Sequence, residues 1–257
     1  GVKLTGIQLI DGFYYDFGTD GVCEDRMKYT GLLEENGNVY YAVVGNLMSG
    51  WQQIGTDMYY FDPATYAGIN GKYISYDLVK TSHYFEYSFV DGKLSSGAWS
   101  SDASGTRYYY GPSFLRGWQT IDGATYYFDV NGYRYEGAHR METGTYSGIF
   151  KWFNFTDEGV YLGVCQGILR IGDNVYYMED GQPIYAGLVK DTDGSYYYIS
   201  GNGCVAIKNR SYYITKTNDL LPEGTYAFGD DGKMIVKQGV VKDSDGQIRY
   251  YVDGQAV

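Results

Sequence analysis

The feature that most constrains this chain is an internal repeat. The segment Gly50–Asp62, which reads GWQQIGTDMYYFD, is closely matched by Gly117–Asp129, which reads GWQTIDGATYYFD. Self-similarity at a fixed interval is the signature of repeat architectures, so we expect many small copies of one unit rather than one large core. Further copies, without the tryptophan, begin at Gly6, Gly31, Gly167, Gly187 and Gly239, and a looser copy begins at Gly97.

Each unit has the pattern of a β-hairpin of about twenty residues. A glycine opens it, a short apolar or aromatic strand follows, and a polar turn leads to a second strand that carries paired tyrosines. Asp-Gly or Asn-Gly often fills the turn, because this dipeptide tolerates positive φ at both central positions of a two-residue hairpin. A composition of 37 glycines and 32 tyrosines among 257 residues predicts strands and turns, and no segment has the pattern of a helix. Examples of this turn dipeptide are Asp11-Gly12, Asn36-Gly37, Asp122-Gly123, Asp193-Gly194 and Asp245-Gly246.

A longer unit separates pairs of short ones, at residues 72–94, 141–160 and 211–234. Each copy ends in an aromatic strand, a turn and a glycine. The order short, short, long recurs with a period of 66 to 72 residues, counted through the short units that open at Gly31, Gly97, Gly167 and Gly239. We therefore predict a single repeat domain over residues 1–257, with approximate blocks 1–94, 95–163, 164–236 and 237–257.

A single hairpin is marginally stable because it cannot bury its own apolar face. Stacked hairpins cover one another, and a tyrosine ring packs between two layers while its hydroxyl stays hydrated or hydrogen-bonded. The predicted fold is therefore all-β, a solenoid of stacked β-hairpins with no single globular core.

The charge balance limits the partners of such a chain. Acidic residues outnumber basic ones by 31 to 20, so the formal charge is −11. Nucleic acid and anionic membrane surfaces are recognised by lysine and arginine, whereas a neutral glycan meets no repulsion from an acidic protein. The alternative interpretation is that the acidic charge serves only to keep the protein soluble. No apolar run is long enough to insert in a membrane, and the segment after Gly1 lacks the regions of a signal peptide, so we interpret the chain as a mature segment or an excised piece.

The unit from Gly117 to Gly137, GWQTIDGATYYFDVNGYRYEG, resembles the cell-wall-binding repeat superfamily. This superfamily includes choline-binding modules of phage lysins and surface proteins, glucan-binding repeats of glucansucrases, and carbohydrate-binding repeats of large clostridial toxins. The resemblance covers nearly the whole chain, and its best copies open at Gly50 and Gly117. It implies a secreted hairpin solenoid at the surface of a Gram-positive cell, which binds a glycan or cell-wall polysaccharide and has no catalytic role.

The residues favour some of these groups over others. Choline-binding units resemble GWxxxxGxWYY, in which two tryptophans and a tyrosine surround a quaternary ammonium. Here Met58 and Thr125 occupy the second tryptophan position, so the cage is incomplete. Toxin and glucan-binding repeats favour IDGxxYYFD, which Ile121–Asp129 matches, and the alternation of short and long units is similar to that of the toxin repeats. In those repeats the implied sugar site lies where a long unit meets its neighbouring short one.

Aromatic side chains supply the candidate binding residues, because a ring on the surface stacks on the apolar face of a pyranose. Trp51 and Trp118 occupy equivalent places, so packing between layers is the alternative for both. In the middle long unit, alternation places Trp152 on the face opposite Lys151, whose ammonium is a donor for sugar hydroxyls or a solvated charge. The candidate ligand-binding residues are Trp152, Lys151, Trp118, Tyr127, Trp51, Tyr60 and Trp99.

Other chemistry is not indicated. Asp191–Gly194 and Asp243–Gly246 share an Asp-x-Asp-Gly pattern, but the glycine comes too early for an EF-hand loop, and both segments lie where hairpin turns are expected. Two histidines and three cysteines without a CxxC pair predict no zinc site, and we predict no metal or cofactor. No hydrolase or phosphate-loop motif occurs, and thin hairpins enclose no water-free pocket, so we do not expect an enzyme.

Two of the cysteines, Cys23 and Cys204, follow closely after a glycine near the end of a hairpin. Related units carry a small or apolar core residue there, as Met234 does after Gly232. We therefore expect both to be buried thiols that act as small hydrophobic residues.

Two classes of function follow from these patterns. The first is a non-catalytic glycan-binding module, and the second is a structural stalk or adhesin spacer whose aromatic residues all serve stacking and whose partner is another protein. Choline-phosphate recognition is a third, which needs two rings facing one pocket. Exposure of the tryptophans distinguishes the first two, and the sequence does not indicate an oligomeric state.

Overall fold

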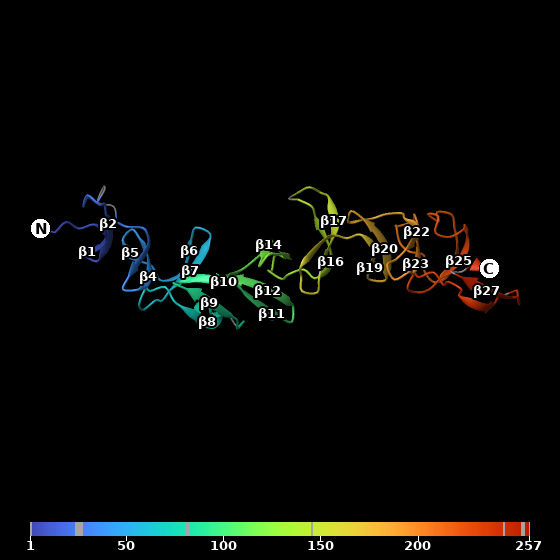
Figure 1. The fold of residues 1–257 in the computed structure, drawn as a ribbon, viewed down its shortest axis with the longest axis horizontal. Coiled ribbons are helices and arrows are strands. Elements are labelled where there is room, and N and C mark those ends of the chain that lie inside the picture. Colours follow the sequence, from blue (N-terminus) through green and yellow to red (C-terminus); the bar gives the residue numbers. More distant parts are fainter. Residues whose placement is uncertain are drawn as a thin grey trace. The chain divides into compact units, whose positions relative to one another are not determined.

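The computed structural model describes residues 2–23, 28–80, 83–144, 146–243, 245–252 and 255–256. The chain divides into two compact units, Gly1–Tyr135 and Glu136–Val257, and within each unit antiparallel hairpins follow one another in chain order (Figure 1). The boundary between the units falls inside the second predicted block. The four blocks themselves stay a prediction.

The hairpins are of three kinds. The first kind, which we call leading hairpins, has a two-residue third strand that pairs with the end of the second strand. There are four among the described residues: β3 (Gly31–Glu35), β4 (Asn38–Val43) and β5 (Asn46–Leu47); β11 (Ala98–Asp102), β12 (Gly105–Tyr110) and β13 (Ser113–Phe114); β19 (Gly167–Ile171), β20 (Asn174–Glu179) and β21 (Gln182–Pro183); β26 (Gly239–Lys242), β27 (Ile248–Val252) and β28 (Gln255–Ala256).

The second kind, which we call following hairpins, has two strands. Three of the four come directly after a leading hairpin, and β1–β2 begins the first unit. They are β1 (Gly6–Ile10) and β2 (Phe13–Phe17); β6 (Gly50–Ile54) and β7 (Asp57–Phe61); β14 (Gly117–Ile121) and β15 (Ala124–Phe128); β22 (Gly187–Lys190) and β23 (Tyr196–Ile199).

The third kind, the long hairpins, corresponds to the long units of the sequence. They are β8 (Gly71–Ile74), β9 (Glu86–Val90) and β10 (Lys93–Ser96); β16 (Gly137–Glu142), β17 (Phe150–Phe155) and β18 (Tyr161–Val164); β24 (Arg210–Ile214) and β25 (Gly224–Phe228). The order leading, following, long therefore confirms the predicted short, short, long repeat.

Hydrophobic clusters form where successive hairpins stack, so each unit is a β-solenoid without one central core, which confirms the predicted fold class. In the first unit, Tyr87 and Phe89 of the long hairpin are buried against Trp51 and Tyr60 of the following hairpin before it. In the second unit, Leu188 of a following hairpin is buried under the next long hairpin. Each layer thus hides the apolar face of the one beside it, as short hairpins require.

The Asp-Gly and Asn-Gly turns are of two types. Asp11-Gly12, Asn36-Gly37 and Asp122-Gly123 have positive φ at both residues, as predicted for two-residue turns. At Asp193-Gly194 and Asp245-Gly246 the prediction is wrong, because only the glycine has positive φ.

These two turns are longer, and the aspartates stabilise them from their side chains. The Asp191 N–H donates to the Ser195 carbonyl over 2.8 Å, and Asp193 Oδ1 accepts from the Ser195 N–H over 2.8 Å. An aspartate that binds its own backbone two residues on forms an Asx turn and needs no left-handed conformation. Both Asp-x-Asp-Gly segments are therefore turns, with Ser244 lying outside the described residues. Nowhere in the described ranges do three or more His, Cys, Asp or Glu side chains form a metal-binding group.

One helix departs from the sequence prediction. α1 (Ser75–Val79) interrupts the first long hairpin between β8 and β9, and it ends at Lys80, whose φ is 53°. Ser75 is fully buried: its hydroxyl donates to the His83 carbonyl over 2.6 Å and accepts from the Phe85 N–H over 3.2 Å. These tertiary bonds hold a single helical turn that five residues would not form alone.

The prediction for two cysteines is also wrong, since Cys23 and Cys204 are half-buried rather than buried. The residue that bridges Ile199 in the way that Met234 bridges Phe228 is Ala206, so the core position lies two residues beyond Cys204. Cys204 itself has a φ of 53° and belongs to the turn. No helix in the described part of the chain is long and apolar enough to cross a membrane.

Candidate ligand-binding surface

Three tryptophans are paired across their hairpins with a tyrosine of the second strand. Trp51 lies opposite Tyr60, Trp118 opposite Tyr127, and Trp99 opposite Tyr108. The ring centroids of the three pairs are 5.3, 5.1 and 4.8 Å apart, and all meet edge to face. The structure therefore brings together four of the predicted ligand-binding residues as two pairs, Trp51 with Tyr60 and Trp118 with Tyr127, because strand register fixes cross-strand neighbours.

Trp51 serves packing. Its ring centroid lies 5.3 Å from that of Tyr87 and 5.6 Å from that of Phe89, both in the long hairpin. Its indole Nε1 is buried and has no hydrogen-bond partner within the described ranges. As a ligand contact, Trp51 and its partner Tyr60 stay a prediction.

Trp99 and Trp118 are more open, with 37% and 43% of their surface exposed. Trp99 packs on the next hairpin through Tyr126, 5.1 Å away, and the Arg134 guanidinium lies 5.6 Å from its ring. An exposed indole edge beside a cation and a hydroxyl offers both stacking and hydrogen bonds to a ligand.

Trp152 and Lys151 lie on β17, on opposite faces as alternation predicts. Trp152 is half-buried, and its backbone N–H donates to the Gly181 carbonyl over 2.8 Å. The Lys151 Nζ lies 2.5 Å from Asp180 Oδ2, so the ammonium is held in an ion pair with the next hairpin. Their role in ligand binding stays a prediction.

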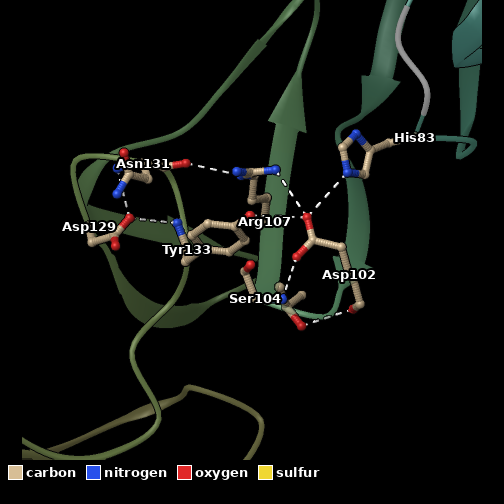
Figure 2. Close-up of polar contacts among 9 residues, drawn as sticks. His83, Asp102, Ser104, Arg107, Asp129, Asn131 and Tyr133 are labelled. Carbon is tan, nitrogen blue, oxygen red and sulfur yellow. Dashed lines mark hydrogen bonds and ion pairs between the residues drawn. The ribbon is translucent and has the colours of Figure 1, made fainter.

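A polar cluster that the sequence did not reveal centres on Asp102 at the turn of β11–β12 (Figure 2). Its Oδ2 lies 3.2 Å from His83 Nε2, accepts from Arg107 Nη1 over 3.3 Å and accepts from the Tyr133 hydroxyl over 3.1 Å. Its Oδ1 accepts from the Ser104 N–H over 2.7 Å. These bonds, led by that of Ser104, lower the pKa of Asp102.

The cluster joins three hairpins. His83 comes from the first long hairpin, Asp102 and Arg107 from the leading hairpin, and Tyr133 from the loop after β15 (Figure 2). The Arg107 guanidinium also lies 3.8 Å from the Tyr133 ring centroid. The only sequence signal is an Asp-x-Ser turn, because residues fifty positions apart meet here only through the stacking.

A groove of about 500 Å³ lies between the leading hairpin β3–β4 and the long hairpin β9–β10. Its apolar side chains include Leu33 and Leu94, with the Tyr59 ring beside them, and charged residues stand at its edge. Lys93 at this edge pairs with Asp57 over 2.6 Å. The lining residues are Leu32, Leu33, Glu34, Val39, Tyr59, Val90, Asp91, Lys93, Leu94 and Ser95.

A second groove, of about 340 Å³, begins at the end of β10 and shares the lining residue Ser95 with the first. It runs from the end of β10 to the following hairpin β14–β15. Two tyrosine rings and several hydroxyl, amide and carboxylate groups face it. The lining residues are Ser95, Ser96, Gly97, Tyr108, Tyr110, Leu115, Gln119, Thr120, Ile121 and Asp122.

Comparison with known proteins places two of the hairpins in a family. Residues 49–63 and 117–134 match the family model described as "Putative cell wall binding repeat". These segments contain the two tryptophan-led units, β6–β7 and β14–β15. Two hairpins of the chain thus match the cell wall binding repeat, and the resemblance recognised from the sequence is confirmed.

Two curated relatives are streptococcal enzymes much longer than this chain. Glucosyltransferase-I of Streptococcus downei is 26% identical over 299 residues, covering 100% of this chain and 18% of that protein. Glucosyltransferase-S of Streptococcus mutans is 25% identical over 244 residues, covering 82% of this chain and 16% of that protein. This chain therefore spans less than a fifth of either relative.

Solved structures also resemble it. Choline binding protein F from Streptococcus pneumoniae, in the presence of a peptidoglycan analogue, is 17% identical, with a TM-score of 0.39 over 100% of this chain and 97% of that one. CbpJ from the same species is 18% identical, with a TM-score of 0.37 over 98% and 97% of the two chains. Alternansucrase in complex with isomaltononaose is 21% identical, with a TM-score of 0.35 over 96% of this chain and 18% of that one.

Proposed function

We propose that this chain is a non-catalytic carbohydrate-binding repeat module, and that the first unit holds a glycan chain in the two grooves that meet at Ser95. The observation that carries this proposal is that both grooves border Ser95 near the end of β10. A polysaccharide is a linear ligand with alternating apolar faces and hydroxyl edges, and a long shallow channel with both kinds of lining is its complement.

The lining chemistry supports a neutral sugar. Tyr59 in one groove and Tyr110 in the other, both half-buried, offer ring surface to pyranose faces. Ser95, Ser96 and Gln119 offer hydroxyl and amide groups that both donate and accept. A formal charge of −11 disfavours an anionic polymer and leaves a neutral one unaffected.

The ligand class we propose is a glucose polymer. Both curated relatives bear the name glucosyltransferase, and this chain corresponds to a minor segment of each. A cell-surface location and a cell-wall glycan are the alternative that the family description supports. With either ligand, the proposed location of the chain is outside the cell, secreted or at the cell surface.

Absence of catalysis is part of the proposal. The carboxylates at the groove edge, Glu34 and Asp91, are exposed to solvent. A general acid of a glycosidase works from a buried, water-poor position that raises its affinity for the proton, and neither residue has one.

The predicted tryptophans supply further contact positions in this proposal. Trp99 and Trp118 have exposed ring surface, and Trp152 stands beside Lys151 in the second unit. A module with several weak sites gains avidity for a repeating polymer without any one site being deep.

One observation favours the alternative, a structural spacer that contacts other proteins. Trp51 is half-buried and packs against Tyr87 and Phe89, so at least one tryptophan serves stacking between hairpins. If all aromatic surface were used in this way, no glycan would bind.

Affinity electrophoresis and titration calorimetry with soluble dextran, together with pull-down on insoluble α-glucan and on purified Gram-positive walls, separate these functions. Ser95 is exposed and shared by both grooves, so Ser95→Trp blocks them and should weaken binding at least about tenfold. Ala64→Trp introduces the same ring on an exposed loop outside the grooves and should bind as the wild type does. Binding to none of these polymers would overturn the proposed function. Equal binding by both variants would show that the glycan does not bind in the grooves.

A further inference from the structure

Asn-Gly is the dipeptide in which an asparagine most readily loses its side-chain amide, because glycine has no Cβ to keep its nitrogen away from the asparagine Cγ. One such dipeptide forms the turn between β3 and β4, and three others lie in the segments that come after β7, β15 and β23. They differ in how firmly the folded protein holds them. The four dipeptides are Asn36-Gly37, Asn70-Gly71, Asn131-Gly132 and Asn202-Gly203.

Loss of the amide needs a particular movement of the chain. The glycine nitrogen has to face the asparagine Cγ, so the peptide plane between the two residues rotates and the side chain swings back over it. A hydrogen bond to that peptide plane, or to the side-chain amide, opposes this movement because it must open first.

Asn131-Gly132 is held at both ends of its peptide plane. The Asn131 carbonyl accepts from Arg107 Nε over 3.0 Å, and the Gly132 N–H donates to the Asp129 carbonyl over 3.0 Å (Figure 2). The Asn131 N–H also donates to Asp129 Oδ1 over 2.8 Å. This peptide plane therefore cannot rotate unless several bonds open together.

Two further asparagines are held at one point each. The Asn202 carbonyl accepts from the hydroxyl of Ser200, a buried residue, over 3.2 Å. Asn70 is held through its side chain, whose Oδ1 accepts from the Asp91 N–H over 2.7 Å. In both cases the atoms that must move are tied to another part of the chain.

Asn36-Gly37 lacks these restraints. The two residues are exposed and form a two-residue turn, with φ values of 52° and 76°. Among the residues that the structure describes, neither the peptide plane between them nor the Asn36 side chain makes a hydrogen bond. A Cβ on Gly37 would meet nothing within 4 Å, so the space around the turn is open.

We propose that Asn36 is a site of spontaneous deamidation in the folded protein and that it converts faster than the other three asparagines. The Gly37 nitrogen gives up its proton and forms a bond to Asn36 Cγ. The bond between Cγ and the side-chain nitrogen breaks, so ammonia leaves and a cyclic imide remains. Water then opens the imide. Cleavage of the new C–N bond leaves an aspartyl residue at position 36, and cleavage of the original peptide C–N bond leaves an isoaspartyl residue.

Both products alter the tip of the hairpin. Each adds a negative charge next to Glu35. The isoaspartyl form also inserts the side-chain methylene into the main chain, which removes the two-residue turn that sets the register of β3 and β4. Leu33 and Val39 of this hairpin line the first groove, so the modification lies in the same hairpin as part of the groove wall.

Peptide mapping by mass spectrometry, during incubation at mildly alkaline pH, measures the conversion of each asparagine in the native and in the urea-unfolded chain. In urea the four should convert at similar rates, because glycine follows each of them. In the native protein Asn36 should keep most of that rate, and the other three should convert at least about tenfold more slowly, because each needs a local opening. Native conversion at Asn36 that is no faster than at the other three would overturn the proposal.

Variants test the site and its cause separately. Asn36→Gln should abolish the conversion of its peptide, which also contains Asn38, and conversion that persists in this variant would contradict the assignment to Asn36. Ser200→Ala removes the hydroxyl that holds the Asn202 carbonyl, so it should speed the conversion of Asn202 and leave that of Asn36 unchanged.

The fold of the Ser200→Ala protein is checked by circular dichroism, because Ser200 is buried. Arg107→Met makes the same comparison at Asn131, whose carbonyl loses its partner, and serves if Ser200→Ala does not fold. An unchanged rate at the released asparagine in a folded variant would show that these hydrogen bonds do not select the site, and would overturn the argument for Asn36.

Discussion

Trp51 and Tyr87 meet edge to face, with ring centroids 5.3 Å apart and planes inclined by 71°, although one belongs to a following hairpin and the other to the long hairpin after it. The Tyr87 hydroxyl donates in turn to the Gly111 carbonyl of the next leading hairpin. Burial raises the pKa of that hydroxyl. Two residues thus connect three successive layers, which shows how this solenoid is held together without a central core.

Truncation of Trp51 should therefore act on stability. Trp51→Ala removes a half-buried ring from between two hairpins and should lower the free energy of unfolding by about 2–4 kcal/mol. Tyr84 lies in the long hairpin that packs against Trp51, but its ring is 70% exposed, so Tyr84→Ala should cost less than about 1 kcal/mol. Urea unfolding of both variants checks this, and equal losses would contradict the packing role of Trp51.

Trp152 should behave in the opposite way if it contacts glycan. Trp152→Ala is expected to weaken binding by about 1–3 kcal/mol, the scale of losing one large aromatic contact, whereas Trp51→Ala should leave the affinity of the folded protein nearly unchanged. Titration calorimetry on both variants measures the difference. Unchanged affinity in a folded Trp152→Ala protein would remove this residue from the candidate set.

Two glycines of the same backbone class should differ in their tolerance of a side chain. Gly123 and Gly181 have φ values of +82° and +71°, but a Cβ on Gly123 meets nothing within 4 Å, whereas one on Gly181 would lie 2.9 Å from the Trp152 carbonyl oxygen. We expect Gly123→Ala to cost about 1 kcal/mol from backbone strain and Gly181→Ala about 3 kcal/mol, because overpacking adds to the strain. Thermal unfolding compares the two, and similar midpoints would show that β17 and the β20–β21 turn are not in close contact.

The ion pair between Asp193 and Lys233 should make stability depend on pH in the acid range. Lys233 Nζ lies 2.7 Å from Asp193 Oδ2, and this bond is the main reason that the pKa of Asp193 falls to about 2 from 3.8. A carboxyl with a lowered pKa in the folded state contributes stability that is present above the unfolded pKa and lost as the pH falls through the folded one. The urea midpoint of the wild type should therefore exceed that of Asp193→Asn near neutral pH, and the difference should close as the pH approaches 2. A difference that is constant across this range would mean that the pair does not stabilise the fold.

Deletion of the last hairpin should leave the rest of the chain folded. Stacked repeats contact only their neighbours, so removal of residues from Gly239 onward should cause a modest loss of stability and no loss of the other hairpins. The deletion also removes the ion pair of Lys237 with Asp243, which are 2.6 Å apart. Circular dichroism that shows complete collapse of the truncated chain would contradict the solenoid.

The repeat could be predicted from the residues alone. Glycines at fixed intervals and tyrosine pairs after polar turns set hairpin length, strand register and the order leading, following, long, because these depend on local φ preferences and on alternation along a strand. The sequence also indicated Trp51, Tyr60, Trp118 and Tyr127 as candidate residues, but only the strand register of the structure showed that they form two cross-strand pairs. The prediction of a two-residue turn was wrong at Asp193-Gly194, because a hydrogen bond from the Ser195 N–H to the Asp193 side chain stabilises a longer turn there.

Which side of each hairpin is covered could not be predicted from the sequence, because it depends on contacts between layers. Trp51 and Trp118 have the same local sequence, yet one ring lies in a packed cluster with Tyr87 and Phe89 and the other is 43% exposed. The Asp102 cluster, the grooves that meet at Ser95 and the turn of helix α1 likewise arise from residues on different hairpins. Stacking brings such residues together through contacts between layers, and no periodicity along one strand records what the neighbouring layer places against it.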